Sequence, residues 1–82
     1  MGNKADDLIK RLRLTKRNWS DTDLGTILLG KGLKSRRGKH GILYKHPKHN
    51  HLTIQIPYRK GVAPVYPKKV LELVEELHKL DS

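Results

Sequence analysis

Residues 31–57 read KGLKSRRGKHGILYKHPKHNHLTIQIP, and apolar and polar residues alternate along parts of this segment as they do in β-strands. The alternation is clearest in LTIQI, whose Leu and Ile side chains would share one face of a strand that Pro57 ends. Gly38 and residues 47–50 mark two turns. The pattern predicts three strands, at about residues 33–37, 40–45 and 51–56. Because the links are short, we expect an antiparallel meander.

Segments with helical periodicity lie before and after these predicted strands. The predicted helices span about residues 5–14, 21–31 and 67–80. Ser20 followed by Asp23 has the form of a capping box at the start of the second helix, and Pro67 suits the first turn of the third. The order helix, helix, three strands, helix predicts an α+β sandwich. In it, helices would pack on one face of a three-stranded antiparallel sheet and leave the other face open.

The composition excludes several classes of protein. The chain has 82 residues, enough for one domain, and no cysteine, so disulfides, thiolate metal sites and cysteine nucleophiles are excluded. Its apolar runs are far shorter than the roughly 20 residues of a membrane span. The first residues, MGNKADD, contain no hydrophobic signal-peptide core. We therefore expect a cytoplasmic protein with no membrane partner.

The charges are unevenly distributed along the chain. Eighteen Lys and Arg residues against eight Asp and Glu residues give a net charge of +10. Between Leu24 and Leu71 there is no acidic residue, whereas this stretch contains eleven Lys or Arg and four His residues. A central surface of one sign is typical of proteins that bind polyanions, and nucleic acid is the leading candidate. The alternative is an ordinary solvated basic surface that keeps the chain soluble.

The densest group of candidate functional residues is the sequence RRGKH, from Arg36 and Arg37 through Gly38 and Lys39 to His40. An imidazole is well suited to take up a proton near neutral pH, and fixed cations beside it can stabilise a phosphoryl group. This combination fits cleavage of RNA, in which a base activates the ribose 2′-hydroxyl for attack on phosphorus. The alternative is that His40 contacts phosphate, or shapes a hairpin, without moving a proton.

Three further histidines, His46, His49 and His51, lie within six residues of one another. They could hold a divalent metal ion, but they straddle a turn and have no nearby carboxylate, so exposed loop residues are the favoured interpretation. His46 could also lie near His40 and protonate a leaving 5′-oxygen.

Aromatic and basic residues elsewhere could add contacts to RNA. Tyr44, Tyr58 and Tyr66 are candidates for stacking on bases, although at least one of the three is expected in the core. The cations beside the predicted loop at residues 58–66 read as phosphate contacts. They are Arg59, Lys60, Lys68 and Lys69.

Four segments, taken in order, resemble the HicA toxin family: RRGKHGILYKHP, LTIQIP, the glycine-containing loop RKGVAPVYP, and KKVLELVEEL. A Gly-Ser/Thr-His turn that opens a strand, a short β run and a closing amphipathic helix are typical of this family. The upstream segment RNW…DLGTILLGKGLKSRR is similar to a subgroup with an N-terminal extension. The resemblance covers about residues 18–80.

The resemblance implies a fold like that of a double-stranded RNA-binding domain, α-β-β-β-α, in residues 18–82, with an extra helix in residues 1–17. It further implies an mRNA interferase that needs no metal or cofactor and is held inactive by a HicB-like antitoxin covering the catalytic face. The family's catalytic histidine corresponds to His40, and its turn glycine to Gly38. Two positions depart from the family pattern. Lys39 replaces the usual Ser or Thr, and the usual aromatic residue appears one position late, at Tyr44.

Three hypotheses follow. The preferred one is a metal-independent endoribonuclease with His40 as general base. Its RNA phosphate contacts would be Arg36, Arg37, Lys39, Lys45, Arg59 and Lys60. The second is a non-catalytic RNA-binding module, a degenerate relative that uses the same surface. The third, a DNA-binding helix-turn-helix, is disfavoured because the residues after Gly32 alternate like a strand and leave no recognition helix.

Overall fold

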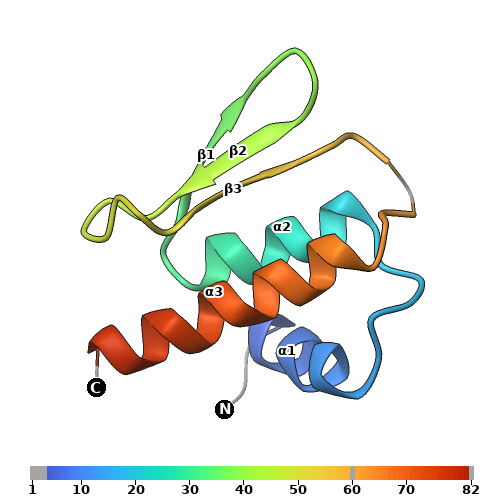
Figure 1. The fold of residues 1–82 in the computed structure, drawn as a ribbon, viewed down its shortest axis with the longest axis horizontal. Coiled ribbons are helices and arrows are strands. Elements are labelled where there is room, and N and C mark those ends of the chain that lie inside the picture. The colour runs from blue at the N-terminus through green and yellow to red at the C-terminus, as the bar shows by residue number, and fades with distance from the viewer. Residues whose placement is uncertain (1–3, 60, 82) are drawn as a thin grey trace.

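The computed structural model describes residues 4–59 and 61–81 and has an α+β fold. Three helices and three strands follow one another in the predicted order (Figure 1). They are α1 (Lys4–Leu14), α2 (Asp21–Gly30), β1 (Lys34–Arg37), β2 (Ile42–Lys45), β3 (Thr53–Ile56) and α3 (Val65–Asp81). The strands form one antiparallel sheet in the order β1-β2-β3. The predicted meander and helix order are thus confirmed.

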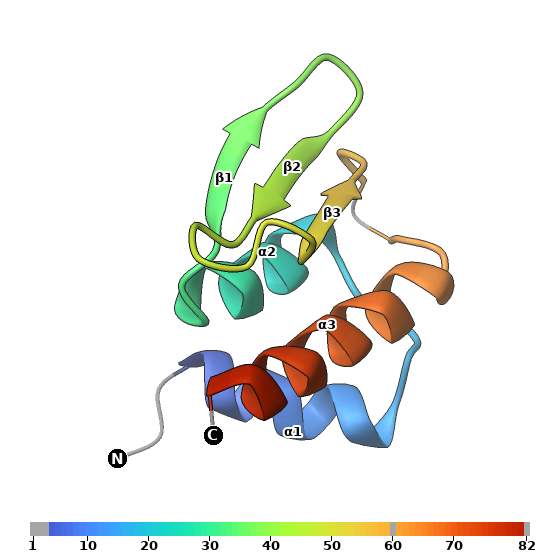
Figure 2. The ribbon, with the colours of Figure 1, turned by 60° about the vertical axis from the view of Figure 1, so that its left-hand side comes forward.

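The elements form three layers. The sheet lies above α2 and α3, and α1 lies on the far side of these two helices (Figures 1 and 2). None of the helices in the described part of the chain is long and apolar enough to cross a membrane. Because α2 and α3 lie against one face of the sheet, that face is covered by helices and the opposite face is open.

The register of the strands explains which side chains face the helices. Tyr44 of β2 lies opposite Ile54 of β3, and both side chains are buried toward the helices. Their neighbours on the same strands point to the other side, because successive residues of a strand alternate between faces. Leu43 and its partner Gln55 are therefore on the open face, where both are exposed.

The core is built from all three layers. Its fully buried side chains include Trp19, Ile56 and Val70, which come from the α1–α2 linker, β3 and α3. The indole Nε1–H of Trp19 donates to the carbonyl of Thr15, 3.0 Å away, so the large side chain is buried without losing its hydrogen bond. Other large side chains that are fully buried are those of Leu12, Leu24, Ile27, Leu28, Pro67 and Val74.

The helix α1 is part of this core. It buries Ile9 and Leu12 against α2 and α3. At the end of α2, a Cβ atom on Gly30 would lie 2.5 Å from the Cβ of Ala5, so the two helices approach closely there. Lys31 Nζ and Asp6 Oδ1 form an ion pair at 3.2 Å beside this contact. The segment 1–17, which the sequence sets apart as an extension, thus contributes a helix that packs on the rest of the domain.

The ends of several elements differ from the prediction. α3 begins at Val65, two residues before Pro67, and Lys68 N–H bonds to the carbonyl of Pro64. The start of α2 is as predicted, because Ser20 Oγ accepts a hydrogen bond of 3.1 Å from Asp23 N–H. β2 begins at Ile42, so the predicted strand over residues 40–45 is too long and His40 lies in the turn.

Candidate nucleic-acid interface

The hairpin of β1 and β2 projects beyond the helices, and its loop is the point of the sheet farthest from them (Figures 1 and 2). Gly38 N–H donates to the carbonyl of Gly41 at 2.8 Å and closes the loop. Lys39 and His40 are therefore at the tip, and both are exposed. This position gives the His40 imidazole free access to a large ligand.

The glycine that the hairpin needs most is Gly41 rather than Gly38. A Cβ atom on Gly41 would overlap the carbonyl oxygen of Ile56 and would lie 3.0 Å from the Cα of Pro57. On Gly38 a Cβ would meet only the carbonyl of Gly41, at 3.2 Å. Gly38 does stand at the turn, as predicted, but sequence reasoning missed Gly41 because its neighbours come from the far end of β3.

The two arginines of β1 point to opposite sides of the sheet. Arg36 lies opposite Leu43 and is on the open face, whereas Arg37 lies opposite Ile42 and is on the helix side. The guanidinium of Arg37 lies 5.6 Å from the ring centre of Tyr58, as in a cation–π contact. Tyr58 Oη in turn donates to the carbonyl of Gly38 at 2.8 Å. Arg37 and Tyr58 thus hold the turn in place, and Arg36 is the arginine presented on the open face.

Two hollows lie at the loop end of the hairpin. One, of about 250 Å³, is lined by Arg36, Arg37, Gly38, Gly41, Leu43 and Gln55. The other, of about 210 Å³, is lined by His40, Gln55, Pro57 and Tyr66. Gln55 borders both hollows, so its side-chain amide lies between the hollow that the two arginines line and the hollow that His40 lines. The alternation in LTIQI predicts that Gln55 faces away from the Leu and Ile side chains, but nothing in the sequence places it beside His40.

The open face of the sheet carries a second group of cations. Lys34 of β1 lies directly opposite Lys45 of β2, on the same face as Arg36. Like charges in such cross-strand pairs repel each other and destabilise a sheet. No strand of the sheet contains an acidic residue to offset them. We call Lys34, Arg36 and Lys45 the basic face; it is where an anion would relieve the repulsion.

The other predicted phosphate contacts lie away from the basic face or outside the described residues. Arg59 is exposed in the loop after β3, and its carbonyl accepts a hydrogen bond from Asp21 N–H at the start of α2. Lys60 lies outside the described residues. Lys68 and Lys69 are exposed on the first turns of α3, and Lys69 lines a groove beside β3.

His46 has a structural role. It is buried, and its Nδ1 accepts hydrogen bonds from the backbone N–H groups of Lys48 at 3.1 Å and His49 at 3.3 Å. The imidazole therefore closes the turn between β2 and β3. All of β2 separates it from His40, and at about 3.3 Å per residue the two rings are far beyond hydrogen-bonding distance. The suggestion that His46 protonates a leaving group near His40 is wrong.

The histidine cluster does not form a metal centre. The rings of His46 and His49 lie 4.9 Å apart, and those of His49 and His51 lie 6.3 Å apart. Since the Nδ1 lone pair of His46 already accepts backbone N–H groups, it is not available to a metal ion. Among the residues that the structure describes, no group of three or more His, Asp or Glu side chains is arranged to hold one.

The three tyrosines occupy three different environments. Tyr44 is the core residue of the three, 3% exposed, with its hydroxyl packed against Gly25 of α2. Burial raises the pKa of Tyr44 above its ordinary value, and the charge of Asp21 and the neighbouring Tyr58 raise it further. Tyr58 supports the turn, and Tyr66 lines the hollow beside His40. Of the three, only Tyr58 and Tyr66 remain candidates for contact with a base.

The fold and this site define a small α+β protein with a basic open sheet face and an exposed histidine at the tip of a hairpin. No known protein family, no curated protein and no solved structure matches the chain.

Proposed function

We propose that this protein is a metal-independent endoribonuclease of the toxin type, with His40 as general base. The observation that carries the proposal is the position of His40, exposed at the tip of a projecting hairpin whose acid-free open face presents Arg36 toward the tip and Lys34 and Lys45 at the other end. The resemblance to the HicA family supports it, because the family's catalytic histidine corresponds to this residue. The order α2-β1-β2-β3-α3 is also the order of a double-stranded RNA-binding domain.

In this proposal the chemistry is an intramolecular transesterification of RNA. The His40 imidazole takes the proton from a ribose 2′-hydroxyl while the 2′-oxygen attacks the adjacent phosphorus. The bond from phosphorus to the 5′-oxygen breaks, the 5′-oxygen takes a proton from solvent, and a 2′,3′-cyclic phosphate remains. Arg36 and Lys39 stabilise the charge on the non-bridging oxygens. Lys34 and Lys45 hold phosphates further along the strand.

The same resemblance suggests where the protein works and which partner inhibits it. An mRNA interferase works in the cytoplasm, and a HicB-like antitoxin would cover the hairpin and the basic face to keep it inactive. Covering this face with protein requires acidic side chains opposite Lys34, Arg36 and Lys45, because buried cations without partners are costly.

A second function, RNA binding without cleavage, is favoured by specific observations at His40. Within the described part of the chain, no side chain forms a hydrogen bond with the His40 imidazole to orient it. Lys39 stands where the family has a hydroxyl, and His46, the nearest other histidine in sequence, is committed to a turn. A hairpin of this kind could bind phosphate through the same cations without transferring a proton.

RNA cleavage by the purified protein in EDTA separates the two functions. His40→Ala tests the base, and His78→Ala is the matched control, because His78 is an exposed imidazole on α3. We expect the wild-type protein and His78→Ala to produce 2′,3′-cyclic phosphate ends, and His40→Ala to lose at least about 100-fold in rate. If the wild-type protein binds RNA but does not cut it, the binding function replaces the enzymatic one.

A further inference from the structure

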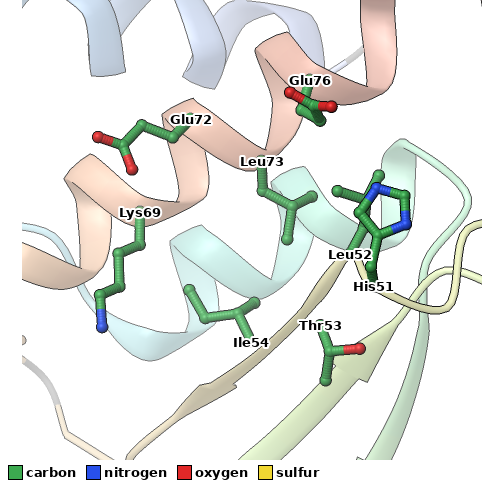
Figure 3. A pocket seen from close by; sticks show the side chains of 8 residues that line it. All are labelled: His51, Leu52, Thr53, Ile54, Lys69, Glu72, Leu73 and Glu76. Carbon is green, nitrogen blue, oxygen red and sulfur yellow. The ribbon is translucent and has the colours of Figure 1, made fainter. Parts of the chain in front are cut away.

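A groove of about 410 Å³ runs between the free edge of β3 and the helix α3 (Figure 3). Its floor is apolar: Ile54 and Leu73 point toward one another from the strand and the helix, and Leu52 lies beside them. These three side chains are 5–8% exposed, so they are core residues whose outer surfaces reach the groove. The groove lies at the β3 edge of the sheet, away from the hairpin loop, and it comes nearest to the basic face at Thr53, which pairs with Lys45.

The strand edge along this groove has backbone groups that no other strand uses. His46 N–H bonds to the carbonyl of Leu52, so Leu52 and Ile54 turn their backbone groups toward β2. In an antiparallel pair such residues alternate with residues that bond in the opposite direction. The carbonyl of Thr53 and both backbone groups of Gln55 therefore face the groove side, where an extended chain could pair with them.

The rim of the groove has charges of both signs. Lys69, Glu72, Leu73 and Glu76 are spaced i, i+3, i+4 and i+7, so they share one face of α3. Figure 3 shows Lys69 at one end of the groove and Glu76 with His51 at the other. The two carboxylates would repel the phosphates of RNA, in contrast to the basic face. A peptide with an acidic and a basic end would complement both ends of this rim.

We propose that the groove is a docking site for an extended segment of a partner protein, which adds a fourth strand beside β3. The segment has alternating apolar residues that cover Ile54 and Leu73, an acidic residue near Lys69 and a basic residue near Glu76. Backbone hydrogen bonds to Thr53 and Gln55 provide affinity, and the apolar floor and charged rim provide specificity. This site is independent of the ribonuclease proposed above.

A library of displayed random peptides, each long enough for a strand of about six residues, identifies the probe. Selection on the intact protein is expected to enrich alternating apolar residues with opposite charges at the two ends. The best peptide is then titrated into isotope-labelled protein. We expect amide shifts in β3 and along residues 69–76, and slowed hydrogen exchange at the Gln55 amide. The same peptide with a central proline is the negative control, because proline cannot donate to the ladder.

Charge reversal on α3 tests whether the selected peptide lies in the groove with its basic end near Glu76. Glu76→Lys is expected to weaken the selected peptide about tenfold, whereas Glu75→Lys, the same change on an exposed position of α3 outside the groove, changes its affinity less than about twofold. Equal effects of the two variants would overturn the proposal, as would a selection that enriches no peptide. Shifts confined to the hairpin, or a groove occupied by RNA or by a second copy of this chain, would also overturn it.

Discussion

The ionisation of Tyr44 is tied to the fold, because its phenol is buried. Burial, then Asp21 and Tyr58, raise its pKa above the ordinary value of about 10. A raised pKa means that the folded protein favours the neutral phenol, so this stabilisation is present below about pH 10 and is lost as the pH rises through the folded pKa. We expect the free energy of unfolding to fall more steeply above about pH 10 in the wild-type protein than in Tyr44→Phe. Parallel slopes in denaturant titrations at several pH values would contradict this.

His46 is predicted to stabilise the β2–β3 turn through its ring nitrogen. His46→Ala removes the acceptor for two backbone N–H groups and leaves a small cavity, so it is expected to cost about 1–3 kcal/mol in urea unfolding. His46→Asn is the informative partner variant, because an Asn side chain also accepts from backbone N–H groups two or three residues later. We expect it to retain more stability than His46→Ala. Equal losses would mean that packing, and not the hydrogen bonds, is what His46 provides.

At the scale of the element, the β1–β2 hairpin depends on Gly41. A methyl group there would overlap the carbonyl of Ile56, so Gly41→Ala is expected to lower the stability by about 1–3 kcal/mol and to shift the hairpin against β3. Gly61→Ala is the matched control, because a Cβ at Gly61 meets nothing within 4 Å. Thermal unfolding of both variants checks the prediction. If Gly41→Ala unfolds at the same temperature as the wild-type protein, the end of β3 can move away from the added methyl group without loss of stability.

The same hairpin shows how far sequence reasoning reaches. The helices were predictable because their periodicity and the Ser20 cap are local signals. The ends of the strands were not, because KSRR in β1 has no apolar residue and all four side chains are exposed. The roles of Gly41, Gln55 and Tyr58 depend on neighbours more than ten residues away, such as the 2.8 Å bond from Tyr58 Oη to the Gly38 carbonyl. Local sequence patterns do not predict contacts between residues so far apart in the chain.

At the scale of the whole molecule, the packing of α1 predicts that the chain unfolds as one unit. Leu12 and Leu14 lie on the same helix, but Leu12 is fully buried and Leu14 is 87% exposed. Leu12→Ala is expected to cost about 2–5 kcal/mol, and Leu14→Ala less than about 0.5 kcal/mol. In both variants, the far-ultraviolet circular dichroism of the helices and the near-ultraviolet circular dichroism of the aromatic side chains should change in a single, shared unfolding transition. A separate early transition of α1 in Leu12→Ala would mean that residues 1–17 are an independent extension.

The charge distribution predicts opposite changes in stability and RNA binding. Lys45→Thr removes one of two lysines that repel each other across β1 and β2, and places a good strand former there, so the folded state should gain about 0.2–1 kcal/mol. Its affinity for single-stranded RNA should fall, and the slope of log affinity against log salt should shrink by about 0.7, the value for one lost phosphate contact. Lys10→Gln, on the exposed surface of α1, makes the same change in net charge away from the sheet. If it weakens RNA binding as much as Lys45→Thr does, the net charge of +10, and not the basic face, controls binding. A difference between the two variants instead means that the chain gives up sheet stability to keep cations where RNA binds.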